Sequence, residues 1–278
     1  MAGGILLGAE QLAADLAGAY APVVLDVRWR LGDPAGGRSE YLRGHVPGAQ
    51  FVDLDTELAS PPGRGGRHPL PEPAVFAAAM RRSGVRGDRA VVVYDAADST
   101  TAARAWWLLR DAGHPQVHVL DGGLRAWVEA GLPLETAVQT VDPGDFRPHP
   151  GQMPVVDAAG ASRVAGAGVL VDARAAARFR GEVEPVDPVA GHIPGARSMP
   201  TLSSVDDRGR FLDPATLRRR FAELGVEPGV EVGAYCGSGV TACQTLLALA
   251  LTGIDGALYP GSWSEWIVDP ARPVATGH

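Results

Sequence analysis

Four blocks of the sequence occur twice, in the same order, once in each half of the 278-residue chain. The matching pairs are VVLDVRW (23–29) with VLVDARA (169–175), LRGHVPGAQ (42–50) with VAGHIPGAR (189–197), 90–109 with 230–249, and 119–133 with 258–273. An ordered series of repeats indicates a duplicated structural unit. We therefore predict two domains of one fold, residues 1–135 and 154–278, joined by a linker at 136–153 that is rich in Pro and Gly.

Short apolar runs alternate with helical patterns within the repeated unit. The strands expected in the first half are VVLDV (23–27), FVDL (51–54), AVVVY (90–94) and VHVL (117–120). Residues 73–84 and 99–113 have apolar side chains at helical spacing and end at Gly. Continuous apolar strands between helices predict an α/β fold, in which each domain is a mainly parallel sheet flanked by helices. Such sheets bind ligands at the carboxyl ends of their strands.

The stretch YCGSGVTAC (235–243) contains both cysteines of the chain. It lies within a predicted strand–loop–helix unit, with Cys236 at the end of the strand. Small residues at Gly237, Ser238 and Gly239 let the backbone point several N–H groups at the sulfur. The helix that starts near Thr241 adds the partial positive charge of its N-terminus. Both stabilise a thiolate, the nucleophilic form of cysteine. Cys243, two helical turns later, is expected to be a buried packing residue.

Composition excludes several other functions. All 25 basic residues are Arg, so neither Schiff-base lysine chemistry nor a phosphate-binding P-loop is available. A net charge of −7 argues against nucleic acid as a partner. Cysteine phosphatases carry an arginine six residues after the catalytic cysteine, but Ala242 stands at that position after Cys236, which excludes phosphatase activity. No metal site is expected. Neither a signal peptide nor a membrane span is expected, and two cysteines make no disulfide framework, so we expect a cytoplasmic protein.

The tandem halves, the GHxPGA motif in both, CGSGVTAC and the late GSWSEW together resemble the two-domain rhodanese-type sulfurtransferases over nearly the whole chain. The loop after Cys236 is most similar to that of the 3-mercaptopyruvate sulfurtransferases. In this family the C-terminal domain is catalytic, and here Asp95 stands at the first-half position that matches Cys236. The resemblance implies that Cys236 accepts sulfur as a persulfide and passes it to cyanide, a thiol or thioredoxin, with no cofactor.

The resemblance also implies roles for individual residues. Ser238 matches a serine of a proton relay, whose other members match Asp55 and His68. The loop that follows Cys236 would bind the transferred sulfur through Gly237, Gly239, Val240 and Thr241. Arg178 matches an arginine that binds the carboxylate of the donor.

One departure from the family pattern concerns the donor. A second arginine is usual about nine residues after the first, but Val186 and Asp187 stand at that point. Thiosulfate therefore remains an alternative donor to 3-mercaptopyruvate, and a weakly catalytic persulfide carrier or interaction module remains an alternative function. His45, His192, Asp26 and Asp172 occur in both halves, including the one without a nucleophile, so we expect them to be structural.

Overall fold

A computed structural model describes residues 4–278; the first three residues of the predicted 1–135 domain lie outside the described residues. The chain forms two compact units. The first unit comprises residues up to Ser60, Pro71–Met153 and Asp207–Phe211, and the second unit comprises Pro61–Leu70, Pro154–Asp206 and Leu212–His278. Each unit therefore takes in a short segment from the other half of the sequence.

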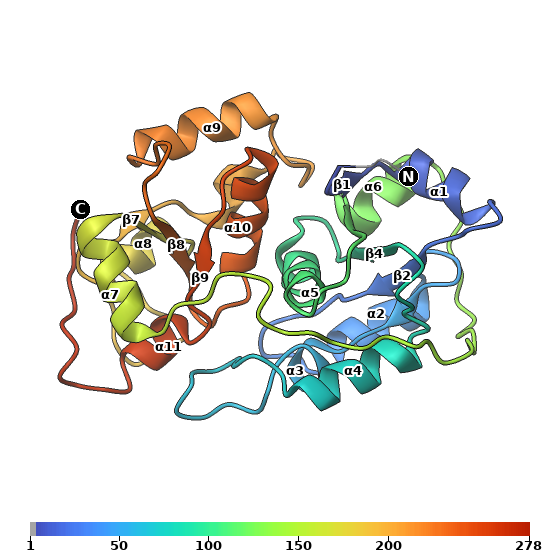
Figure 1. The fold of residues 1–278 in the computed structure, drawn as a ribbon, viewed down its shortest axis with the longest axis horizontal. Helices are drawn as coiled ribbons and strands as arrows, with labels where there is room; N and C mark the ends of the chain where they lie inside the picture. Colours follow the sequence, from blue (N-terminus) through green and yellow to red (C-terminus); the bar gives the residue numbers. More distant parts are fainter. Residues whose placement is uncertain (1–3) are drawn as a thin grey trace. The chain divides into compact units, whose positions relative to one another are not determined.

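The first unit is built on a parallel sheet with strand order β1-β5-β4-β2-β3 (Figure 1). Its strands are β1 (Leu6–Leu7), β2 (Val23–Asp26), β3 (Gln50–Phe51), β4 (Val91–Tyr94) and β5 (Val117–Leu120). Its helices are α1 (Ala9–Leu16), α2 (Gly36–Arg43), α3 (Leu54–Glu57), α4 (Pro73–Arg82), α5 (Thr100–Asp111) and α6 (Gly123–Glu129).

The second unit repeats this arrangement with strand order β7-β6-β8-β9, again all parallel. Its strands are β6 (Val169–Asp172), β7 (Arg197–Ser198), β8 (Val232–Tyr235) and β9 (Ala257–Leu258). Its helices are α7 (Ala158–Ala167), α8 (Ala176–Phe179), the 3₁₀ helix η1 (Thr201–Ser204), α9 (Pro214–Glu223), α10 (Ala242–Leu251) and α11 (Ser262–Trp266). Val155 forms a parallel bridge to Leu258 of β9. This bridge takes the place that the pairing of β1 with β5 has in the first unit. The predicted α/β fold, two repeated parallel sheets flanked by helices, is confirmed.

One predicted strand is shorter than expected. FVDL was expected to be extended throughout, but β3 ends at Phe51. Asp53 instead caps helix α3, because its carboxylate accepts a hydrogen bond from the Thr56 N–H at 2.9 Å. The aspartate that interrupts the apolar run therefore begins a helix.

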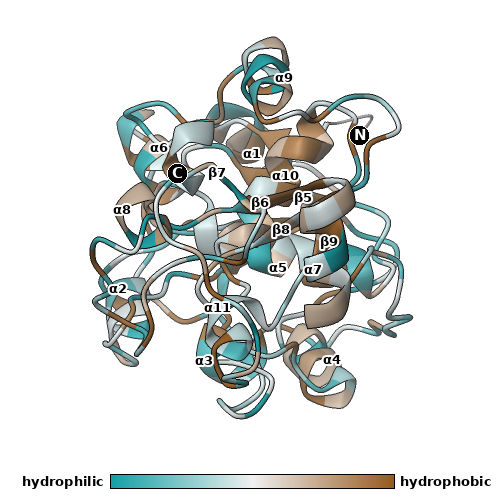
Figure 2. Cartoon of the chain, turned by 90° about the vertical axis from the view of Figure 1, so that its left-hand side faces the viewer, coloured by the Kyte–Doolittle hydropathy of each residue, from teal (hydrophilic) through white to brown (hydrophobic). Residues whose placement is uncertain are grey.

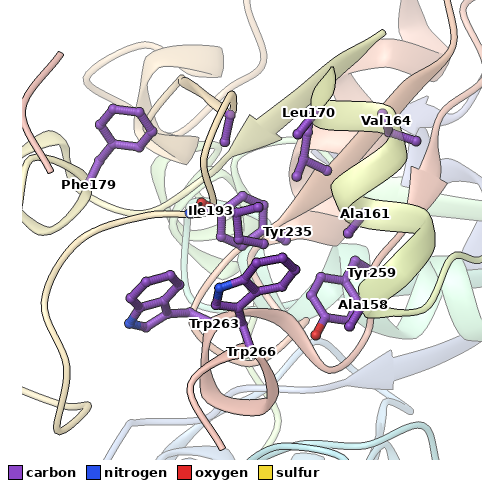
Figure 3. Close-up of a cluster of buried hydrophobic side chains, with 12 residues drawn as sticks. Ala158, Ala161, Val164, Leu170, Phe179, Ile193, Tyr235, Tyr259, Trp263 and Trp266 are labelled. Atoms are coloured by element: carbon purple, nitrogen blue, oxygen red, sulfur yellow. Dashed lines mark hydrogen bonds between the residues drawn. The ribbon is translucent and has the colours of Figure 1, made fainter. Parts of the chain in front are cut away.

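The interior of the second unit consists of apolar strands and an apolar helix. Every residue of β6 and β8 is buried, as parallel strands covered on both faces require. Figure 2 shows the hydrophobic colouring concentrated on these strands and α10, while α9 carries hydrophilic residues. Tyr235 packs in a cluster with Leu170, Ile193 and the two tryptophans of α11 (Figure 3). This packing fixes the end of β8.

The duplicated polar residues make the same contacts in both units. Arg28 forms a buried ion pair with Asp26, and Arg174 forms one with Asp172, both at 2.6 Å. The His45 ring stacks on Tyr41 and the His192 ring on Phe179, and each Nδ1 lies 2.8 Å from a backbone carbonyl oxygen. These contacts are those of structural residues.

Candidate active site

Cys236 directly follows the buried strand β8. Its neighbour Tyr235 pairs in register with Asp172 at the end of β6, so the cysteine lies at the carboxyl edge of the sheet. The Cys236 side chain is buried, and the Gly239 N–H donates to its Sγ at 3.1 Å. The backbone is held from α11, because Cys236 N–H donates to Ser262 Oγ and Trp263 N–H donates to the Cys236 carbonyl. The loop thus brings one backbone donor to the thiol, where the sequence predicted several.

The two glycines of the loop are required for different reasons. Gly239 has φ +80°, a left-handed conformation that favours glycine, and a Cβ there would lie 2.3 Å from the Pro260 carbonyl oxygen. Gly237 has no such conformation. A Cβ on Gly237 would instead lie 3.1 Å from Arg67 Nη2 and 3.7 Å from Arg178 Nη1. Gly239 permits the turn, and Gly237 makes room for two guanidinium groups.

The remaining loop residues lead into α10. Val240 is buried and Thr241 occupies the N-cap position, but its side chain caps no helix N–H. The carbonyls of both residues accept from the first turn of the helix. Cys243 is buried inside α10, where its Sγ donates to the Gly239 carbonyl at 3.4 Å. Its contacts are those of a packing residue.

The structure brings two of the predicted relay residues together. His68 Nδ1 lies 2.7 Å from Ser238 Oγ, and both side chains are buried. His68 reaches Ser238 because residues 61–70 belong to the second unit. Asp55, the third predicted member, belongs to α3 of the first unit, and its Oδ2 accepts from Trp29 Nε1 at 2.9 Å. The role of Asp55 stays a prediction.

Arg178 is part of an ion-pair cluster that the sequence did not reveal. Its guanidinium binds Glu184 at 2.6 Å and Asp187 at 3.0 Å. Asp187 also binds Arg67 at 2.6 Å, and Glu184 also contacts Arg174. Arg67 was not among the predicted site residues. The only sequence signal for it was its place directly before His68.

The first unit contains a carboxylate where the second has its thiol. Asp95 follows β4 and is buried. Its two oxygens accept four backbone hydrogen bonds of 3.0–3.2 Å, from Ala97, Ser99, Thr101 and Ala102. Counted from Asp95 and Cys236, Ala97 and Ser99 match Ser238 and Val240. Among the described residues, the N–H groups of Ser238 and Val240 have no acceptor. The duplicated loop therefore binds an anion in the first unit.

Within residues 4–278 no group of three or more His, Cys, Asp or Glu side chains is placed to hold a metal ion. No helix in the same range is long and apolar enough to cross a bilayer.

Known proteins resemble the chain over nearly its whole length. The sequence profile of the rhodanese-like domain matches residues 9–130 and 157–269. A Pseudomonas aeruginosa protein named "Probable 3-mercaptopyruvate sulfurtransferase" is 50% identical over 98% of both chains. A Mycobacterium tuberculosis protein named "Putative thiosulfate sulfurtransferase SseB" is 46% identical over 99% of this chain and 98% of its own. The crystal structure of SseA from Escherichia coli, a 3-mercaptopyruvate sulfotransferase, superposes with a TM-score of 0.82 at 35% identity, covering 95% of this chain and all of that one.

The conformation of Gly239 leads to a first prediction. In Gly239→Ala the added Cβ would clash with the Pro260 carbonyl oxygen, and alanine would have to adopt a positive φ. We therefore expect sulfur transfer to be lost and the free energy of unfolding to fall by more than about 1–2 kcal/mol. Gly253→Ala is the matched control, because Gly253 has φ +79° but no atom within 4 Å of its added Cβ. Equal effects of the two substitutions on urea unfolding and activity would show that the Pro260 contact is unimportant.

The buried carboxylate leads to a second prediction. The pKa of Asp95 is raised to about 6, mainly because the carboxyl group is buried and secondly because the negative charge of Asp98 is nearby. The backbone hydrogen bonds to Asp95 lower its pKa and offset part of this effect. An unfolded aspartate titrates near pH ~3.9, so between these values the folded state binds the proton and the unfolded state does not. This group therefore stabilises the fold below pH ~4, and that contribution, at most about 3 kcal/mol, is lost as pH rises through 6.

Asp95→Asn tests this assignment by removing the titrating group. Urea unfolding of both proteins, measured at several pH values from 4 to 7.5, should show that the wild type gains stability on acidification relative to the variant. A constant difference between the two proteins over this range would contradict the raised pKa of Asp95.

Proposed function

The chain belongs to the rhodanese-like family, and from that premise we propose that it transfers sulfur from 3-mercaptopyruvate to a thiol acceptor through a persulfide on Cys236. The 3-mercaptopyruvate relatives cover both domains, at identities up to 50%, and support this choice of donor. We also propose that residues 1–135 and 154–278 form its non-catalytic and catalytic domains, joined by 136–153. Its two free, buried cysteines support a cytoplasmic location.

The observation that carries the proposal is the equivalence of Asp95 and Cys236. In an aspartate the carboxylate oxygens lie two bonds beyond Cβ, and in a cysteine persulfide the outer sulfur lies at the same place. The Asp95 carboxylate therefore stands in for a persulfide anion. By this correspondence we propose that the N–H groups of Ser238 and Val240 bind the outer sulfur, while the Gly239 N–H donates to Sγ. A loop of this kind stabilises both the attacking thiolate and the product.

The donor step follows from this arrangement. The Cys236 thiolate attacks the donor's sulfur, an S–S bond forms, and the C–S bond breaks with its electron pair going to the carbon. The products are the Cys236 persulfide and the enolate of pyruvate, which becomes pyruvate on taking up one proton. The thiolate of an acceptor, such as reduced thioredoxin, then attacks the outer sulfur and releases the Cys236 thiolate. This is covalent, two-step catalysis.

The Ser238–His68 pair supports the proton transfer that this step requires. A hydroxyl 2.7 Å from an imidazole nitrogen lets a proton move between them, so Ser238 delivers the proton and His68 replaces it. We propose Asp55 as the residue that orients His68. The Ser238 hydroxyl comes from the same loop as Cys236, which keeps the proton close to the carbon that loses sulfur.

Thiosulfate is the second candidate donor. The 46% identity to a provisional thiosulfate sulfurtransferase favours it, and its sulfane S–S bond would break to release sulfite. Against it, residues 237–241 contain no basic side chain. Steady-state turnover with each donor separates the two activities, and absence of turnover with both would leave a persulfide carrier.

The nucleophile leads to a third prediction. Cys236→Ser should reduce turnover with 3-mercaptopyruvate by at least about a thousandfold, because the hydroxyl does not form the persulfide. Cys243→Ser is the matched control and should keep most activity, since Cys243 is a fully buried packing residue of α10. Sulfur transfer that persists in Cys236→Ser, measured as pyruvate release in the presence of a thiol, would overturn the proposed mechanism.

The relay leads to a fourth prediction. Ser238→Ala and His68→Asn should each lower kcat for 3-mercaptopyruvate by about 10²–10⁴, the usual contribution of acid–base catalysis, and should change KM much less. The double variant should be no worse than the worse single variant, because the two side chains act as one unit. His149→Gln, a change to an exposed histidine, is the control. Full additivity of the two losses would argue against a shared proton path.

A further inference from the structure

Positions 186 and 187 carry no arginine, but two arginines of the second unit lie beside Asp187. Asp187 is almost fully buried, and each of its carboxylate oxygens binds a different arginine. Oδ1 lies 2.6 Å from Arg67 Nη1, and Oδ2 lies 3.0 Å from Arg178 Nη2. The position expected to provide a second arginine therefore provides a carboxylate that holds two guanidinium groups side by side.

Both guanidinium groups lie against the loop of the nucleophile. The site of a Cβ on Gly237, the residue after Cys236, lies 3.1 Å from Arg67 Nη2 and 3.7 Å from Arg178 Nη1. Asp187 binds the Nη1 of Arg67 and the Nη2 of Arg178. Arg67 Nη2 and Arg178 Nη1 are the terminal nitrogens that do not bind Asp187, and both lie beside Gly237, as Arg178 Nη2 also does at 3.7 Å, so an anionic donor at Cys236 would meet them.

Arg67 is held in place as a binding residue would be. Its backbone N–H donates to Ser264 Oγ at 3.0 Å, and a Cβ on Gly66 would lie 2.7 Å from the Gly261 carbonyl oxygen. Its side chain is 24% exposed, so it remains accessible to a ligand. Its Nε is buried and has no hydrogen-bond partner among the described residues, which leaves a donor for a ligand to satisfy.

The other arginines near position 187 do not fit this role. Arg180 forms its ion pair with Glu182 in an exposed position. Arg197 lies on β7 and is exposed. The arginines 67, 174 and 178 are balanced by Asp172, Glu184 and Asp187. Attraction of a donor therefore depends on the direction of N–H groups and not on surplus charge.

We propose that Arg67 is the second guanidinium that binds the carboxylate of the sulfur donor, together with Arg178, and that Asp187 is the positioning residue for both. The inference rests on the proposed function and specifies the donor as an anion, a 2-oxo carboxylate in the favoured case. The N–H groups of a guanidinium donate directed, charge-assisted hydrogen bonds to the oxygens of a carboxylate. Arg67 thereby replaces the arginine missing at 187.

Arg67→Gln tests the proposal. It should raise KM for 3-mercaptopyruvate about tenfold to a hundredfold and change kcat by less than about threefold, the effect of losing one charge-assisted contact. Arg64→Gln removes an exposed arginine from the same segment and should leave both constants unchanged. An unchanged KM in Arg67→Gln, with normal wild-type turnover, would overturn the inference and leave the proposed function standing.

A charge exchange tests Asp187 as the positioning residue. Arg67→Asp and Asp187→Arg should each raise KM, because the first leaves two carboxylates together and the second leaves three guanidinium groups without their shared carboxylate. The double variant restores one cation and one anion and should recover KM to within a few-fold of the wild type. A double variant no better than the single variants, with a normal circular dichroism spectrum and melting temperature, would overturn the positioning role.

A binding measurement separates this inference from the proposed function. Pyruvate, the carboxylate product, is titrated calorimetrically into wild type, Arg67→Gln and Arg64→Gln. Weaker binding in Arg67→Gln alone supports Arg67 as a carboxylate ligand even if the wild type turns over neither donor, which would contradict only the proposed function. Equal pyruvate binding by all three proteins would overturn the inference.

Discussion

The parallel pairing of β8 with β6 and β9 is the constraint on which the active site depends. The strand is buried along its whole length, so its register with β6 fixes where it ends and therefore where Cys236 lies. The turn that follows has little freedom, because Gly239 passes against the Pro260 carbonyl and α11 holds the Cys236 backbone. The polar loop is thus positioned by an apolar interior.

Duplication gave the chain two such loops, and they differ in what occupies their backbone donors. In the first unit Asp95 supplies the acceptor from its own side chain and occupies the amide donors. In the second unit Cys236 leaves two matching donors without an acceptor among the described residues, and in the proposed mechanism these donors bind the outer sulfur of the persulfide. The residue at the end of the strand, Asp95 in one loop and Cys236 in the other, therefore determines whether the backbone donors are already occupied.

The sequence was sufficient for the features that depend on local pattern. The repeated blocks predicted the two parallel sheets, the apolar runs predicted β2, β4 and β5, and the Gly-Ser-Gly context distinguished Cys236 from Cys243. It was insufficient where distant segments meet. The Arg67–Asp187 pair joins residues 120 positions apart, and no spacing rule connects them. The prediction of a strand through all of FVDL was wrong beyond Phe51, because the apolar pattern does not indicate that Asp53 caps a helix.

Mass spectrometry of the protein after exposure to 3-mercaptopyruvate, with no acceptor present, tests the central claim most directly. The account predicts a gain of one sulfur atom per chain, located by peptide analysis on Cys236 and absent from Cys243, and removed again by an added thiol. A protein that releases pyruvate and leaves Cys236 unmodified, or that gains its sulfur on Cys243, would contradict the account.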